Sequence, residues 1–103
     1  MINKEIIIKT LINEFPKLRN EFKVKQIGLF GSYSQNQANE QSDIDLIIEF
    51  SEPIGLKFIQ LCDYLENLFN KKVDILTPDG LKSIRIKSVI DNILNTIEYV
   101  NAA

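Results

Sequence analysis

The segment that most constrains the fold is Ile44 to Phe50, a run that is apolar on both faces for part of its length. A strand with one solvated face alternates apolar and polar residues, whereas a strand covered on both faces reads as a nearly continuous apolar run. The segment therefore predicts a central strand rather than an edge strand, which places further strands beside it.

The rest of the chain supplies the other elements. Short apolar segments bounded by turn residues predict strands, and apolar residues at helical spacing predict helices. Because proline fits a first helical turn, Pro16 is expected to begin a second helix. The predicted strands are 24–30, 44–50 and 72–76, and the predicted helices are 4–14, 16–22, 56–69 and 81–98, with a short helix behind Ser32 and a turn at 77–80. The expected fold class is mixed α/β or α+β, with helices flanking a sheet of three to four strands.

Two absences narrow the chemistry. The sequence has no histidine, which excludes Ser-His-Asp and Cys-His nucleophile pairs. Its single cysteine, Cys62, excludes an internal disulfide, and with no histidine the chain alone cannot assemble a structural zinc site. Any metal must therefore be held by oxygen, which favours Mg²⁺, Mn²⁺ or Ca²⁺.

Length and charge narrow the function further. A chain of 103 residues predicts a single domain over residues 1–103. The net charge of −2 and a pI near 5.1 argue against binding to nucleic-acid phosphates, so no direct nucleic-acid binding is expected. No apolar run approaches the roughly 20 residues that cross a bilayer, and the first ten residues lack a secretory cleavage pattern. A cytoplasmic protein without a membrane partner is therefore expected.

The residues that could carry chemistry lie where predicted strands meet loops. Asp43 and Asp45 open the strand 44–50, and the alternation of side chains along a strand places both on the same face. Two carboxylates about 4 Å apart repel by roughly 4 kcal/mol at an effective dielectric near 20, so such a pair favours a bound cation. Mg²⁺ accepts these oxygen ligands and keeps positions for water and substrate phosphates.

Gly31 and Ser32 supply the complementary half of such a site. A glycine at a strand end lets the backbone approach a phosphate, and free N–H groups at a following helix start, with the Ser32 hydroxyl, favour an anion. If the strand 72–76 lies beside the strand 44–50, Asp74 completes a triad that ligates metal or accepts the proton of an attacking hydroxyl. Taken singly, each motif also fits an ordinary turn or a solvated acidic pair. Their combination pairs a phosphate-binding turn with a carboxylate-held metal, which both phosphoryl transfer and nucleotidyl transfer require.

The same residues carry a resemblance to a known family. Gly31-Ser32, then ten residues, then Asp43-x-Asp45, with a later Asp74, resembles the minimal nucleotidyltransferases of the DNA polymerase beta-like superfamily. The resemblance covers about residues 16 to 100 and includes segments 30–33, 42–46, 53–56, 73–77 and 97–100. It implies the polymerase beta-like nucleotidyltransferase fold.

The resemblance also implies site residues and partners. Asp43, Asp45 and Asp74 would be the catalytic ligands of Mg²⁺, with Mn²⁺ as an alternative, and Gly31 and Ser32 would bind the phosphates of ATP. Family members of this size are often antitoxins encoded beside a helical HEPN-type toxin, and some transfer AMP from ATP to a tyrosine of that toxin. About 100 residues leave no room for a separate acceptor-binding domain, so a partner protein is expected to supply the hydroxyl.

The chain departs from the family pattern after Gly31-Ser32. The family continues with Gly-Ser-x-Ala-Arg-Gly, whereas this chain has Tyr33-Ser34-Gln35-Asn36, and a glutamine cannot neutralise phosphate charge as arginine does. Two sources of compensation are expected: a cation elsewhere in the chain, Arg85, Lys82 or Lys57, or a cation contributed by the partner.

Two other functions stay open from the sequence. One is a non-catalytic antitoxin that neutralises its partner by contact alone. The other is a nucleotidyltransferase acting on a small molecule or an RNA end. The apolar faces of the first and last predicted helices are also compatible with a homo-oligomer.

Overall fold

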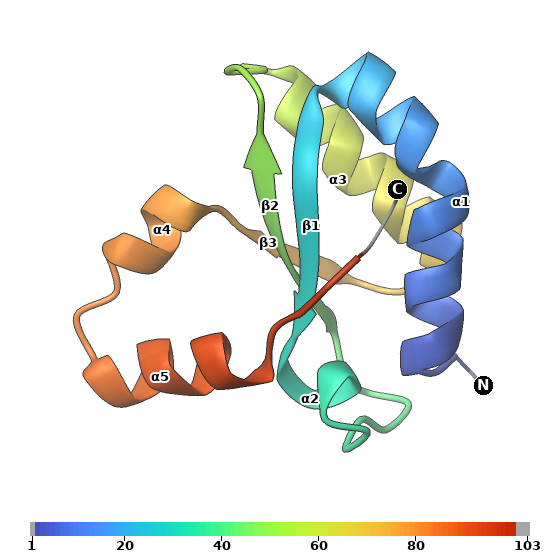
Figure 1. Cartoon of the computed structure of the whole chain (residues 1–103). Coiled ribbons are helices and arrows are strands. Elements are labelled where there is room, and N and C mark those ends of the chain that lie inside the picture. Colours follow the sequence, from blue (N-terminus) through green and yellow to red (C-terminus); the bar gives the residue numbers. More distant parts are fainter. Residues whose placement is uncertain (1, 101–103) are drawn as a thin grey trace.

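The computed structural model describes residues 2–100 and contains a four-stranded mixed sheet with helices on both sides (Figure 1). The strands, in the spatial order β3-β2-β1-β4, are β1 (Val24–Phe30), β2 (Ile44–Phe50), β3 (Val73–Leu76) and β4 (Glu98–Tyr99). The helices are α1 (Lys4–Phe22), α2 (Gly31–Ser34), α3 (Lys57–Phe69), α4 (Pro78–Lys82) and α5 (Lys87–Thr96). β1 pairs antiparallel with β2 and β4, and β2 pairs parallel with β3. The expected fold class and the central position of the strand 44–50 are confirmed.

Helices α1 and α3 cover one face of the sheet (Figure 1). In β2 the alternate side chains of Ile44, Leu46 and Ile48 are fully buried against these helices. Burial of each such side chain contributes roughly 1.5–3 kcal/mol. This core fixes the register of β2 and so directs the side chains between them, including that of Asp45, to the other face.

Helix α1 differs from the prediction, because it continues through Pro16 instead of ending before it. Asn3 begins the helix by accepting a hydrogen bond from the Ile6 N–H at 2.9 Å. The buried stripe runs unbroken past the proline: Ile7, Leu11, Phe15, Leu18 and Phe22. Pro16 lies on the exposed side of the helix, so its ring does not disturb the buried stripe. The core contacts of this stripe outweigh the one helical hydrogen bond that proline cannot donate.

The prediction of one helix over 81–98 is wrong, because α4, α5 and β4 occupy this part of the chain. Thr77 caps α4, accepting a hydrogen bond from the Gly80 N–H at 3.1 Å, and Pro78 takes the first helical position. The predicted turn at 77–80 is therefore a helix start. After α5, Val100 N–H donates to the Ile27 carbonyl at 2.8 Å, so the chain leaves the helix to pair with β1.

Helices α4 and α5 lie on the other side of the sheet from α1 and α3 (Figure 1). The segment after α5 crosses the sheet at close range, since a Cβ at Gly28 would lie 2.8 Å from Ile97 Cγ2 and 2.9 Å from Ile47 Cγ2. This second face, which carries Asp45, is covered in part, since Ile47 is 6% and Ile93 of α5 8% exposed. None of the described helices combines the length and the apolar character that a membrane span needs.

Candidate active site

The three predicted carboxylates meet at the end of the sheet where β2 and β3 begin. The two strands run parallel in a register that pairs Asp45 with Asp74, and Asp43 lies in the loop that leads into β2. Paired residues on neighbouring strands point to the same face about 5 Å apart. The predicted position of the third strand beside the second is confirmed.

The electrostatics of this group centre on Asp45. Burial, and then the negative charges of Asp74 and Asp43, raise the pKa of Asp45 from its ordinary 3.8 to about 6. The folded protein therefore binds this proton more tightly than an unfolded chain does, and the carboxylate stays the main form at pH 7. A cation held beside Asp45 would offset the negative charges of Asp74 and Asp43 and so favour the ionised form further.

A lysine that the sequence reasoning missed lies among these carboxylates. The Lys72 ammonium is 3.9 Å from Asp43 Oδ2 and 3.8 Å from Asp74 Oδ1. Lys72 precedes Asp74 by two residues, so in an extended segment both side chains point to the same side. The two-residue spacing between Lys72 and Asp74 is the sequence pattern from which the position of Lys72 could have been predicted.

The donor chemistry of the group fits a hard divalent ion, but its side chains are not yet gathered around one. All three acidic residues offer carboxylate oxygens, the ligands that Mg²⁺ and Mn²⁺ accept. Within residues 2–100, no three or more His, Cys, Asp or Glu side chains are already drawn together as metal ligands. Binding of a metal here requires that the carboxylates turn toward it and that Lys72 give way.

Gly31 is required beside this group for two reasons. Its φ of +76° lies in the left-handed region that favours glycine, and a Cβ on it would overlap Oδ2 of Asp45. The turn from β1 into α2 therefore runs directly over the Asp45 carboxylate and carries Ser32 with it. The predicted neighbourhood of Gly31-Ser32 and the acidic group is confirmed.

These features are those of a known enzyme class, and sequence comparison agrees. A family model described as a nucleotidyltransferase domain matches residues 8–100. Protein adenylyltransferase MntA of Thermococcus cleftensis is 40% identical over 95 residues, which cover 91% of this chain and 96% of that protein. The chain belongs to the nucleotidyltransferase domain family. The enzyme class that the motifs predicted is confirmed.

Solved structures share the fold of this nucleotidyltransferase. A structure described as a candidate minimal nucleotidyltransferase matches with a TM-score of 0.69 at 22% identity, over 94% of this chain and 95% of the other. A toxin-antitoxin structure with AMP-PNP matches with 0.62 at 24% identity, over 99% and 75% of the two chains. A tri-AMPylated Shewanella oneidensis HEPN toxin in complex with MNT antitoxin matches with 0.58 at 19% identity, over 93% and 73%. The predicted minimal nucleotidyltransferase fold is confirmed.

The end of α5 holds the turn of this nucleotidyltransferase in place. The Gly31 N–H donates to Thr96 Oγ1 at 3.3 Å, and the buried Ser34 hydroxyl donates to the Thr96 carbonyl. The Gly31 N–H, one of the donors at this turn, is therefore already engaged by Thr96. Thr96, 65 residues away in sequence, is a positioning residue that no local pattern reveals.

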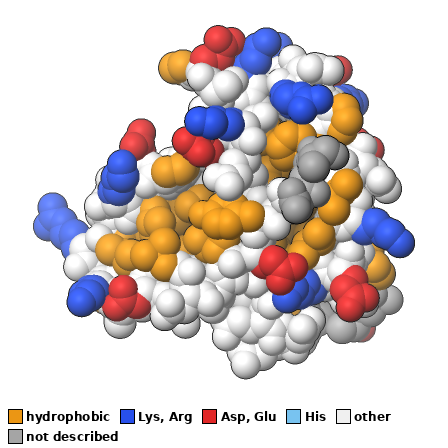
Figure 2. All heavy atoms as spheres, viewed as in Figure 1, with side chains coloured by type: hydrophobic (Ala, Val, Ile, Leu, Met, Phe, Trp, Pro, Cys, Tyr) orange, Lys and Arg blue, Asp and Glu red, His pale blue; other side chains and the backbone are white. Residues whose placement is uncertain are grey.

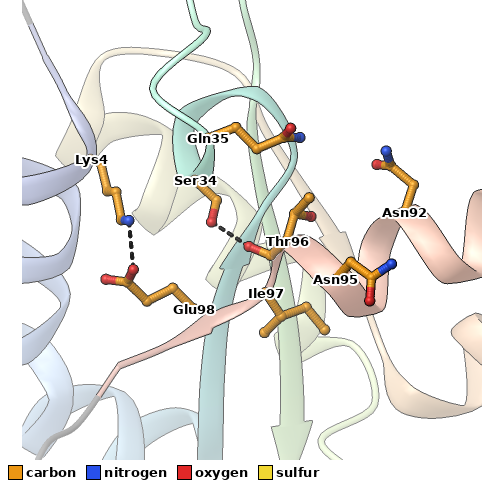
Figure 3. A pocket seen from close by; sticks show the side chains of 8 residues that line it. All are labelled: Lys4, Ser34, Gln35, Asn92, Asn95, Thr96, Ile97 and Glu98. Carbon is orange, nitrogen blue, oxygen red and sulfur yellow. Dashed lines mark hydrogen bonds and ion pairs between the residues drawn. The ribbon is translucent and has the colours of Figure 1, made fainter.

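A polar cavity of about 570 Å³ lies beside the same contact, between α2 and α5 (Figure 3). Side chains of Gln35, Asn92 and Asn95 face it, and the Lys4–Glu98 ion pair, 2.6 Å long, closes one side. The residue at the family's arginine position, Gln35, thus lies in an uncharged part of the wall.

Two of the cations suggested as replacements for that arginine lie elsewhere. Lys57 Nζ donates to the Glu21 carbonyl at 3.3 Å, and Lys82 lines a cavity with residues from the last part of β2. Both lie toward the end of the sheet where β2 finishes, whereas Asp45 lies where it begins. Arg85 is exposed, in the connection between α4 and α5.

Proposed function

We propose that this nucleotidyltransferase is a Mg²⁺-dependent protein adenylyltransferase that moves AMP from ATP to a tyrosine hydroxyl of a HEPN-type toxin and so acts as its antitoxin. The observation that carries the proposal is the in-register pair Asp45 and Asp74, with Asp43 beside it and Gly31 packed onto Asp45. Nucleotidyl transfer requires a phosphate-binding turn next to metal-binding carboxylates.

Each residue has a defined task in this reaction. Asp43 and Asp45 hold the metal, which when bound neutralises charge that develops on the phosphate oxygens. Gly31 and Ser32 position the triphosphate so that the acceptor oxygen attacks the α-phosphorus and pyrophosphate leaves. Asp74 is exposed beside Asp45 and serves as a further metal ligand or as the acceptor of the hydroxyl proton.

Exposed apolar side chains on the side of the sheet that carries Asp45 support a protein as the acceptor. Asp45 and Ile47 both lie on this face of β2, where Ile47 is buried, and the register continues from Ile47 through Gly28 to Tyr99 at the edge, which is 50% exposed. Apolar side chains gather over α5 and the neighbouring sheet in the same view (Figure 2). Exposed members on α5 and just before it are Ile86, Val89 and Leu94. An apolar surface next to the carboxylates suits docking of a folded partner better than a small polar substrate.

The relatives point to the same reaction. The protein from Thermococcus cleftensis is named a protein adenylyltransferase, one structural neighbour holds AMP-PNP, and another pairs an AMPylated HEPN toxin with an MNT antitoxin. These names support ATP as donor and a HEPN-type protein as acceptor for this chain. The acidic pI supports a protein acceptor over an RNA end.

A second candidate is a non-catalytic antitoxin. It is favoured by Gln35 at the arginine position and by metal ligands that are not yet gathered within residues 2–100. The two candidates differ in whether neutralisation needs the carboxylates.

Neutralisation in cells separates them. The wild type, Asp43→Asn/Asp45→Asn and the control Glu49→Gln would each be co-expressed with the HEPN-type toxin. The control changes a partly exposed carboxylate four residues further along β2 than Asp45. We expect growth to be rescued by the wild type and the control and not by the double variant. Rescue by a correctly folded double variant would establish neutralisation by contact and reject the catalytic proposal.

A further inference from the structure

Lys72 is held loosely between two of the metal-binding carboxylates. Its distances of 3.9 Å to Asp43 and 3.8 Å to Asp74 exceed those of direct hydrogen bonds, so the interaction is mainly Coulombic. The Lys72 side chain is 65% exposed, and those of Asp43 and Asp74 are 41% and 52% exposed. Exposed ion pairs of this kind are weak and are readily exchanged for another cation.

The neighbouring lysine is committed elsewhere. Lys71 Nζ donates to the Glu40 carbonyl at 2.7 Å and lies 5.9 Å from the centre of the Tyr33 ring. Two adjacent lysines therefore differ in position: Lys72 lies at the carboxylates and Lys71 does not. With Lys57 and Lys82 toward the opposite end of the sheet, Lys72 is the basic side chain that the structure places at the acidic group.

We propose that Lys72 alternates between the carboxylates and the nucleotide. In the metal-free protein its ammonium neutralises Asp43 and Asp74. When a divalent ion takes that place, the ammonium is repelled and moves onto the phosphates of the bound nucleotide, where it supplies the positive charge that Gln35 does not. The inference rests on the proposed function, because it assumes that Asp43 and Asp45 bind metal.

The flexible stem of lysine makes the exchange possible. Four methylene groups join the ammonium to the backbone, and they let the charge move by several ångströms while β3 stays fixed. A triphosphate held at Gly31-Ser32 would lie beside the same carboxylates as Lys72, since Gly31 contacts Asp45, which pairs with Asp74. Lysine binds phosphate as a point charge and needs no fixed fork geometry.

Two affinities measured on the purified chain test the exchange. Mn²⁺ alone is titrated by electron paramagnetic resonance, and AMP-PNP is titrated by calorimetry at saturating Mn²⁺. We expect Lys72→Met to bind Mn²⁺ about two- to fivefold more tightly and AMP-PNP about tenfold more weakly. Lys71→Met, which removes the same charge one residue away, should change either affinity by less than about twofold. Lys72→Arg should restore most of the AMP-PNP affinity, because it keeps the charge.

Opposite shifts in the two affinities are the specific sign of exchange. Unchanged Mn²⁺ affinity in Lys72→Met, a loss of both affinities, or equal shifts in Lys71→Met would each overturn the proposal. The variant Asp43→Asn/Asp45→Asn distinguishes a failure of the exchange by Lys72 from a failure of the proposed function. If that variant binds Mn²⁺ like the wild type, the metal site itself is wrong, whatever Lys72 does.

Discussion

The α-carbon of Gly31 lies against the carboxylate of Asp45, so closely that any Cβ at position 31 would overlap Oδ2. The turn that leaves β1 and the strand that carries Asp45 are thus in direct contact. A side chain at position 31 would have to displace the carboxylate that is proposed to bind the metal.

Gly31→Ala should therefore lower stability and activity together. A left-handed backbone and the overlap with Asp45 should cost about 2–4 kcal/mol in the free energy of unfolding, measured in urea. Gly55→Ala is the matched control, since Gly55 has a φ of +59° but no atom within 4 Å of its Cβ position. It should lose only about 1 kcal/mol and keep nucleotide binding. Equal losses in the two variants would show that the contact with Asp45 is unimportant.

Stability should depend on pH through Asp45. Because folding raises its pKa from 3.8 to about 6, the folded state binds the proton more tightly than the unfolded chain does. The destabilisation is absent below about pH 4, develops as the pH rises toward 6 and is complete above it. Asp45→Asn removes it, so the variant should gain about 1 kcal/mol relative to the wild type between pH 4 and pH 7, allowing for solvent screening. Urea unfolding across this pH range measures the difference, and a flat difference would contradict the burial of Asp45 among like charges.

Metal and nucleotide should stabilise the folded chain together. At about 100 times the dissociation constant, Mg²⁺ with AMP-PNP should raise the free energy of unfolding by about 2.7 kcal/mol. Asp43→Asn/Asp45→Asn should lose this gain, whereas Glu49→Gln should keep it. Thermal unfolding with and without EDTA gives the comparison. A gain that survives in the double variant would place the ligand elsewhere.

Thr96→Val should loosen α5 from α2. The substitution removes a hydroxyl that accepts from the Gly31 N–H and donates to the Ile93 carbonyl, at an expected cost of about 1 kcal/mol. Hydrogen exchange of the α5 amides should become faster, and nucleotide affinity should fall as the turn loses its support. Thr10→Val removes a hydroxyl that donates to the Ile6 carbonyl of its own helix, and it should leave α5 unchanged. Unaltered exchange in Thr96→Val would show that packing alone fixes α5.

The sheet was predictable because its strands carry their own signals. The apolar runs 24–30 and 44–50 have the predicted bounds, and the strand with Asp74 differs by one residue at its start. Elements that depend on distant partners were not predictable. Pro16 stays in a continuous helix because the core continues past it, and Ile97 leaves the helix because the edge of β1 needs a partner.

The site shows the same division. The alternation of side chains along a strand was enough to predict that Asp43 and Asp45 share a face. The position of Asp74 beside them could be predicted only on the condition that its strand neighbours β2, which it does. Lys72 was not predicted, although its spacing of two residues from Asp74 places both side chains on one side of an extended segment. Thr96 reaches Gly31 only through the tertiary fold, and local periodicity carries no trace of such a contact.

Transfer of label from ATP tests the central claim most directly. The purified chain would be incubated with Mg²⁺, α-phosphate-labelled ATP and a lysate of its native host as acceptor pool, beside Asp43→Asn/Asp45→Asn and Glu49→Gln. The account predicts label on a protein band that resists RNase, that appears with the wild type and Glu49→Gln, and that is lost in the double variant. Label that persists in a folded double variant, or that appears on RNA alone, would contradict it.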